Sequence, residues 1–221
     1  MTEPLLTDRQ HVDGIDCVSK GRTRRAVKAL ADGKPVVLVD RRMRRGELLV
    51  SAELATTAAI AFAVRHTSGF LRVILPAQRC RDLGLVAQCG ADDEHAGTHT
   101  GQRVSVDAAL GIGTGISATD RARTIRVLAS PNSTPDSLTR PGHVVTQRVA
   151  LHRPLADYGY DEAALQLALS ADLQPSVVLA TIVGTGASVD LCSGDELLTF
   201  ANELRLPLVS VDDVITHAKY I

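Results

Sequence analysis

The histidine of the segment Arg140-Pro141-Gly142-His143 is the side chain best suited to proton transfer in this chain of 221 residues. An unperturbed imidazole has a pKa of about 6.5, so it can both accept and donate a proton near neutral pH. His143 could therefore take part in acid–base chemistry, and Arg140 could contact a substrate beside it. The alternative is structural: His143 is a satisfied turn histidine, and Arg140 only ties down its loop.

A second polar segment runs from Gly113 to Arg121, with the sequence GTGISATDR. It combines glycines with hydroxyl and carboxyl groups, of which Thr114 could bind a substrate and Asp120 could take part in catalysis. Ser117 followed three residues later by Asp120 also resembles the start of a helix, so Asp120 could merely cap that helix. The glycines lack the spacing of a dinucleotide or Walker loop, and we assign them no nucleotide.

The elements that must position these residues alternate along the chain. Apolar periodicity and turn signals predict strands at 35–39, 70–75, 103–106, 177–183 and 207–211. They predict helices at 22–32, 53–66, 77–83, 117–129, 161–173, 195–204 and after 212. This order predicts an α/β or α+β fold in one globular domain, 21–221, preceded by a flexible segment, 1–20.

Charge and cysteine content exclude several classes of function. The 24 basic residues balance 25 acidic ones, so we expect neither nucleic acid nor a membrane surface as partner. No apolar run approaches the roughly 20 residues of a membrane helix, and the protein is expected to be cytoplasmic. The 4 cysteines show no metal-binding spacing, and we predict no metal and no cofactor.

Several segments together resemble the 3,4-dihydroxy-2-butanone 4-phosphate synthase family of riboflavin biosynthesis. They are GKPVVLVD from Gly33, VRHTSGF from Val64, GTGISATDRARTIR from Gly113, TRPGHV from Thr139 and PLVSVDDVI from Pro207. The resemblance implies a single α+β domain with a mixed sheet and flanking helices. It also implies a homodimer with active sites near the subunit boundary, which converts ribulose 5-phosphate with magnesium into formate and a four-carbon phosphate. Because these motifs are intact, the resemblance further implies that His143 and Asp120 are catalytic and that Arg140 and Thr114 bind substrate.

The chain departs from the family where the resemblance places the magnesium ligands. Met43 stands in place of a glutamate and Tyr160 in place of a histidine, and a thioether cannot replace the hard oxygen ligands of magnesium. Glu47 keeps the acid that ends the same loop. Arg72 replaces a cysteine, and Thr181 replaces a glutamate. We expect Glu47 and Tyr160 to be catalytic, and Met43, Arg72 and Thr181 to contact substrate, although Met43 and Tyr160 could simply fill space.

Charges are also exchanged around the expected substrate site. Asp157 stands where the family has an arginine, and Asp161 brings a carboxylate to a helix N-terminus that would otherwise attract phosphate. We expect Asp161 to cap that helix and to line the substrate site. The segment 41–45 and Arg72 bring positive charge to the same region, and we expect one of these arginines to pair with Asp157 or Asp161. Alternatively, the basic segment is only a solvated loop.

These departures favour a repurposed, metal-independent enzyme that acts on another small molecule in specialised (natural-product) biosynthesis. Two alternatives remain: an active 3,4-dihydroxy-2-butanone 4-phosphate synthase, and a non-catalytic dimeric partner or scaffold.

Overall fold

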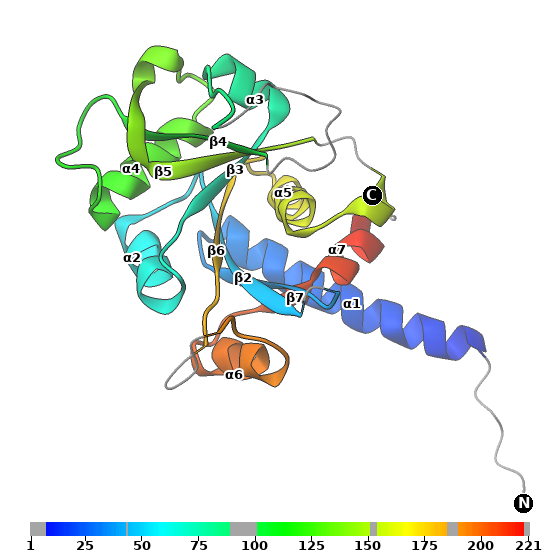
Figure 1. Cartoon of the computed structure of the whole chain (residues 1–221). Coiled ribbons are helices and arrows are strands. Elements are labelled where there is room, and N and C mark those ends of the chain that lie inside the picture. Colours follow the sequence, from blue (N-terminus) through cyan, green and yellow to red (C-terminus); the bar gives the residue numbers. More distant parts are fainter. Residues whose placement is uncertain (1–7, 43, 89–100, 151–153, 185–189, 219–221) are drawn as a thin grey trace, which may run out of the picture.

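The computed structural model describes residues 8–42, 44–88, 101–150, 154–184 and 190–218. In this part of the chain, a seven-stranded mixed sheet with the order β4-β5-β3-β6-β2-β1-β7 forms the centre of one α+β domain (Figure 1). The strands are β1 (Val36–Asp40), β2 (Arg45–Ser51), β3 (Arg72–Pro76), β4 (Gln102–Ala108), β5 (Leu138–Val149), β6 (Val177–Thr181) and β7 (Leu208–Ser210). The predicted fold class is therefore confirmed.

Helices cover both faces of the sheet and bury two hydrophobic clusters. One cluster includes residues of α2 (Thr57–His66), α3 (Ala77–Asp82), α4 (Ala118–Ala129) and α6 (Asp195–Glu203). The other includes residues of α1 (Asp8–Ala31), α5 (Tyr160–Ser170) and α7 (Val211–Ala218). Successive strand residues point to opposite faces, so Leu48 joins the first cluster and Leu49 the second. A sheet covered on both faces explains why its inner strands are apolar without interruption.

Most predicted elements are found within a few residues of their expected bounds. Two strands were not predicted. β2 follows the basic segment, and its polar start, Arg-Gly-Glu, leaves only a short apolar run from which a strand could be predicted. β5 contains Pro141 and Gly142, which normally argue against a strand interior. The helix expected at 22–32 is the second half of α1, which begins at Asp8, and the division of the chain at residue 20 stays a prediction.

The Arg-Pro-Gly-His motif lies in an irregular part of β5. Val144 pairs with Val106 of β4, whereas Thr139 pairs with the next residue, Asp107. Residues 140–143 are therefore additional residues on one strand, and they bulge out of the ladder. The Arg140–Pro141 peptide bond in this bulge is cis. As a result, His143 is displayed beside Asp107 instead of being paired within the sheet.

Within the described residues, no helix combines the length and the apolar character required to cross a membrane.

Candidate active site

His143 forms a hydrogen-bonded pair with Asp107. The His143 Nδ1 atom lies 2.7 Å from Asp107 Oδ2, and the His143 backbone N–H donates to Asp107 Oδ1 at 3.0 Å. Asp107 is buried, whereas the imidazole is 41% exposed. The carboxylate therefore fixes Nδ1 of the partly exposed ring, and Nε2 has no hydrogen bond to a described residue. Sequence reasoning missed Asp107, although the residue directly follows the alternating segment Arg103-Val104-Ser105-Val106.

The glycine-rich loop before α4 packs tightly against this pair. Gly115 has a φ of +87°, and a Cβ atom there would lie 2.3 Å from Asp107 Oδ2 and 2.6 Å from His143 Nδ1. Only glycine can therefore occupy this position. Asp120 holds the loop, because its carboxylate accepts hydrogen bonds from the backbone N–H groups of Gly113 and Gly115 at 3.2 and 3.1 Å. These backbone donors, Gly113 first, lower the pKa of Asp120.

Asp120 thus positions the loop that contacts the His143–Asp107 pair, while Ser117 caps α4 by accepting from the Asp120 backbone N–H. Arg140 is likewise tied to the protein: its guanidinium donates to the backbone carbonyls of Leu83, Pro135 and Leu138 at 2.5–3.3 Å. Thr114 is exposed at the tip of the loop. Arg140 therefore ties down its loop, as in its structural alternative, whereas Asp120 does not cap α4, because Ser117 does so. Thr114 is accessible to a ligand.

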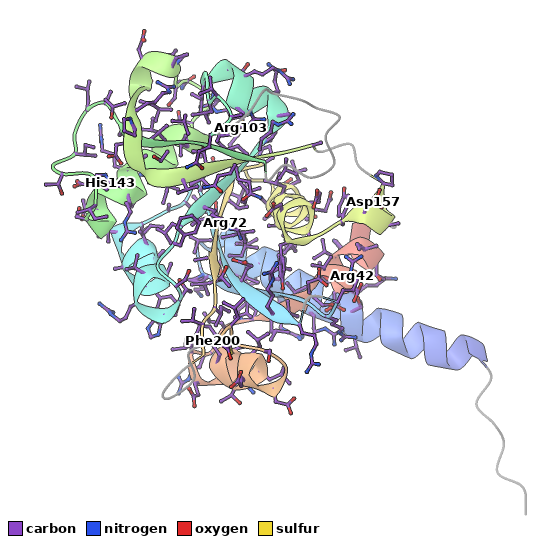
Figure 2. The ribbon with its side chains drawn as sticks, in the orientation of Figure 1. Arg42, Arg72, Arg103, His143, Asp157 and Phe200 are labelled. Carbon is purple, nitrogen blue, oxygen red and sulfur yellow. The ribbon has the colours of Figure 1, made fainter. Side chains whose placement is uncertain are left out.

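A second polar cluster lies deeper in the molecule, where β2, β3 and β6 adjoin. The Nη2 atom of Arg72 lies 3.0 Å from Glu47 Oε1, and the Thr181 hydroxyl donates to the same oxygen at 2.9 Å. Glu47 is only 3% exposed, and burial raises its pKa despite the attraction of Arg72. Its second oxygen, Oε2, is buried with no hydrogen-bond partner among the described residues. Arg72 also donates to Gln147 at 3.0 Å. Figure 2 shows Arg72 near the middle of the sheet, well separated from His143.

Asp161 joins this cluster from the first turn of α5. Its carboxylate lies 3.8 Å from the Nη1 atom of Arg72 and accepts a hydrogen bond from the side-chain amide of Gln147. Burial is the largest influence on this group and raises the pKa of Asp161 to about 6. The prediction that an arginine pairs with Asp157 or Asp161 is confirmed for Arg72 and Asp161. The prediction that Asp161 caps α5 is wrong, because Glu162 accepts the Gly159 backbone N–H at 3.0 Å, while Asp161 turns toward the sheet.

Tyr160 joins the ends of two strands. Its hydroxyl donates to the carbonyl of Arg45 and accepts from the backbone N–H of Asp40 at 3.1 Å. The side chain is 7% exposed, and burial raises the pKa of Tyr160 to about 12. With both its donor and an acceptor position used by the backbone, this phenol supports the β1–β2 turn. The catalytic role expected for Tyr160 stays a prediction.

The basic segment divides into inward and outward side chains. Arg42 lies 3.5 Å from a carboxylate oxygen of Asp40 and donates to the carbonyl of Tyr158 at 2.6 Å. It therefore pairs internally, but not with the acids at 157 and 161. Arg41 and Arg44 are exposed. Met43 lies outside the described residues.

The residues of the deeper cluster do not fit a magnesium ion. Magnesium needs oxygen ligands in near-octahedral geometry, usually carboxylates that are free to bind it. Here the guanidinium of Arg72 already stands between Glu47 and Asp161. Across the part of the chain that the structure describes, no group of three or more His, Cys, Asp or Glu side chains could hold a metal.

Comparison with known proteins places the chain in a family of enzymes. The model of the 3,4-dihydroxy-2-butanone 4-phosphate synthase family matches residues 24–217, and the chain belongs to this family. The "Riboflavin biosynthesis protein RibBA" of Rhodococcus erythropolis is 44% identical over 204 residues, which cover 89% of this chain and 47% of that protein. The protein of the same name from Mycobacterium tuberculosis is 43% identical over the same length. The chain thus spans about half the length of these curated relatives.

Solved structures agree with this assignment. A 3,4-dihydroxy-2-butanone 4-phosphate synthase described as a complex with two magnesium ions superposes with a TM-score of 0.78 at 32% identity, covering 88% of this chain and 95% of that one. The synthase of Candida albicans gives a TM-score of 0.79 at 31% identity, covering 88% and 96%.

These relatives correct the function favoured in the sequence analysis. A repurposed enzyme for another small molecule is the wrong prediction, because identity of 44% over most of the chain to riboflavin-biosynthesis proteins supports the family's own pathway. The retention of most of the sequence thus outweighs the replacement of a few side chains.

Proposed function

We propose that this chain catalyses the reaction of its family in riboflavin biosynthesis, the conversion of ribulose 5-phosphate into formate and 3,4-dihydroxy-2-butanone 4-phosphate. The observation that carries the proposal is the 44% identity to riboflavin-biosynthesis proteins over 89% of the chain. The intact pairing of His143 with Asp107 adds support, since the retained Arg-Pro-Gly-His motif displays a usable proton acceptor.

The chemistry that this pair can supply is proton transfer. A ketose phosphate must lose a proton from a carbon next to its carbonyl before its skeleton can rearrange. His143 Nε2 would accept that proton, and the buried Asp107 carboxylate at Nδ1 would stabilise the resulting imidazolium. Magnesium, when bound, would polarise the neighbouring oxygens of the substrate, although the described residues do not fit the ion.

The deeper cluster supplies a buried cation beside carboxylates. Arg72 has more donors than its three neighbours use, and Glu47 Oε2 has an unused acceptor position. A hydroxylated substrate offers both donors and acceptors, so we assign this cluster to binding the polyol part of the substrate. We also propose that the chain forms a homodimer, as the resemblance to the family implies, and that it acts in the cytoplasm.

Formate release from ribulose 5-phosphate tests the proposal directly. The chain is incubated with the substrate in excess magnesium and, separately, after chelation, and formate is measured by NMR. We expect enzyme-dependent formate in at least one of the two conditions. The absence of formate from both would contradict the proposed reaction. The ratio between them measures whether the Arg72-bridged carboxylates still respond to the ion.

Variants of His143 and Asp107 test whether these two residues are needed for formate release. We expect His143→Gln and Asp107→Asn each to slow formate release by about a hundredfold or more, which is the usual contribution of general acid–base catalysis. Arg65→Gln changes an exposed residue of α2 and serves as the control with unchanged rate. Equal rates for the His143 variant and the control would exclude the imidazole from the reaction.

A further inference from the structure

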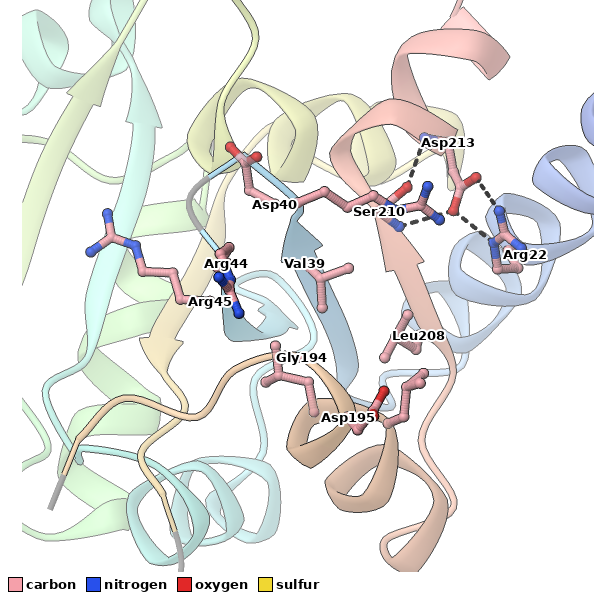
Figure 3. Close-up of a pocket in the computed structure, with 13 residues that line it drawn as sticks. Arg22, Val39, Asp40, Arg44, Arg45, Gly194, Asp195, Leu208, Ser210 and Asp213 are labelled. Carbon is pink, nitrogen blue, oxygen red and sulfur yellow. Dashed lines mark hydrogen bonds and ion pairs between the residues drawn. The ribbon is translucent and has the colours of Figure 1, made fainter. Parts of the chain in front are cut away.

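A cavity distinct from both polar clusters lies between α6, the β1–β2 turn and the start of α7 (Figure 3). Its volume is about 370 Å³. Pockets that bind small molecules run from about 300 to 1,000 Å³, so the cavity is large enough for one ligand. None of the residues that we assign to the proposed reaction lines it.

The cavity is a slot with two apolar walls. In the parallel pairing of β1 with β7, Leu208 lies opposite Val37 and Ser210 opposite Val39. Val39, Leu208 and Ser210 therefore share one face of the sheet, because side chains alternate along a strand. Leu197 and Leu198 of α6 line the cavity from the facing helix, and Leu198 is 50% exposed. A slot between a sheet face and a helix suits a flat apolar body.

Four arginines contribute to the lining of the slot. Arg41 and Arg44 line it, and both are exposed with no ion pair to any described residue. Arg22, in contrast, forms a two-pronged pair with Asp213, with nitrogen–oxygen distances of 2.7 and 2.6 Å. Figure 3 shows the Arg45 guanidinium directed away from Leu208 and Arg22. Arg41 and Arg44 are thus the cations that a ligand in the slot could use.

The acidic lining residues are mostly satisfied by the protein itself. Asp213 is paired with Arg22 and also accepts from the backbone N–H of Ser210 at 3.0 Å. Asp40 is buried and accepts from the backbone N–H of Arg42 at 2.8 Å. Asp195, in the first turn of α6, is the exposed carboxylate. Two uncommitted cations against one exposed acid give the mouth a net preference for anions.

We propose that this slot binds an aromatic phosphomonoester, with its ring between Val39, Leu208 and α6 and its phosphate between Arg41 and Arg44. Guanidinium groups are the side chains best matched to phosphate, because their planar donors contact two oxygens at once. The inference does not rest on the proposed catalytic function, since binding is measured directly and without turnover.

Binding of FMN and AMP by calorimetry tests the slot, with riboflavin, adenosine and inorganic phosphate as the corresponding fragments. At low salt we expect at least one of the two monophosphates to bind about tenfold or more tightly than either of its fragments. Added salt should weaken that binding, because it screens the exposed arginines. Failure of both monophosphates to bind at millimolar concentration would overturn the proposal, as would binding of each no tighter than its fragments.

Matched variants test the binding of the phosphate and the binding of the ring separately. Arg41→Gln/Arg44→Gln should weaken the monophosphate about tenfold or more, whereas Arg24→Gln/Arg65→Gln, which removes the same charge from exposed positions outside the lining, should leave it unchanged. Leu198→Ser should weaken FMN or AMP but not inorganic phosphate. Equal effects of the two double variants would show a nonspecific charge effect and would also overturn the proposal.

Discussion

At the scale of a single residue, burial and the charge of Arg72 shift the pKa of Asp161 in opposite directions, and burial has the larger effect. Its carboxyl group has a pKa near 3.8 in an exposed setting and about 6 in the folded chain. Because the folded state binds the proton more tightly than the unfolded state, the stabilisation from this group is present below about pH 4 and is lost as the pH rises through 6.

The variant Asp161→Asn should therefore gain stability over the parent as the pH rises from 4 to 7, reaching an advantage of about 1–3 kcal/mol. Urea unfolding at several pH values measures this difference. Asp195→Asn, at an exposed position of α6, should show no such trend. If the advantage of Asp161→Asn stays constant with pH, burial does not raise the pKa of the Asp161 carboxyl group.

At the scale of elements, Tyr160 connects α5 with the turn between β1 and β2. The variant Tyr160→Phe leaves the Asp40 N–H and the Arg45 carbonyl without this partner, so we expect a loss of about 1–3 kcal/mol in the free energy of unfolding. Denaturant titration checks the value. Tyr158→Phe is the matched control, since Tyr158 is also buried but the structure gives its hydroxyl no hydrogen bond to a described residue. Similar losses for the two variants would contradict the bridging role.

The sequence allowed most elements to be predicted, because the apolar spacing of segments such as 36–39 and 117–129 decides their structure locally. β5 could not be predicted, since its bulge at 140–143 is stabilised by a partner strand more than 30 positions away. The same distance concealed Asp107, whose role depends on the bulge. The pairing of Arg72 with Asp161 could be anticipated from charge alone, whereas the backbone contacts of Tyr160 depend on how α5 meets the sheet.

At the scale of the whole molecule, large apolar side chains stay exposed on the loop that carries Gly115. Leu110 is 77% exposed and Ile116 is 54% exposed. Burial of this loop against a second copy would remove both from water and would place the His143–Asp107 pair near the boundary between subunits.

We therefore expect the chain to elute as a dimer, at twice its mass of 23.5 kDa, and Leu110→Asp/Ile116→Asp to elute as a monomer. Light scattering after gel filtration distinguishes the two. Val86→Asp/Leu169→Asp, which changes exposed apolar residues of other segments, should stay dimeric. A parent chain that is monomeric at micromolar concentration would remove this loop from consideration as an interface.

The strand order also has a consequence for how the sheet meets its surroundings. One border is β7, which has only 3 residues, and the other is β4, where Ala87 forms a bridge to Arg103. A border offers unpaired amide and carbonyl groups to any extended chain that approaches it. A short strand on one side and a bridged one on the other leave few such groups in a row, so the sheet is poorly suited to recruit foreign strands into amyloid-like stacks.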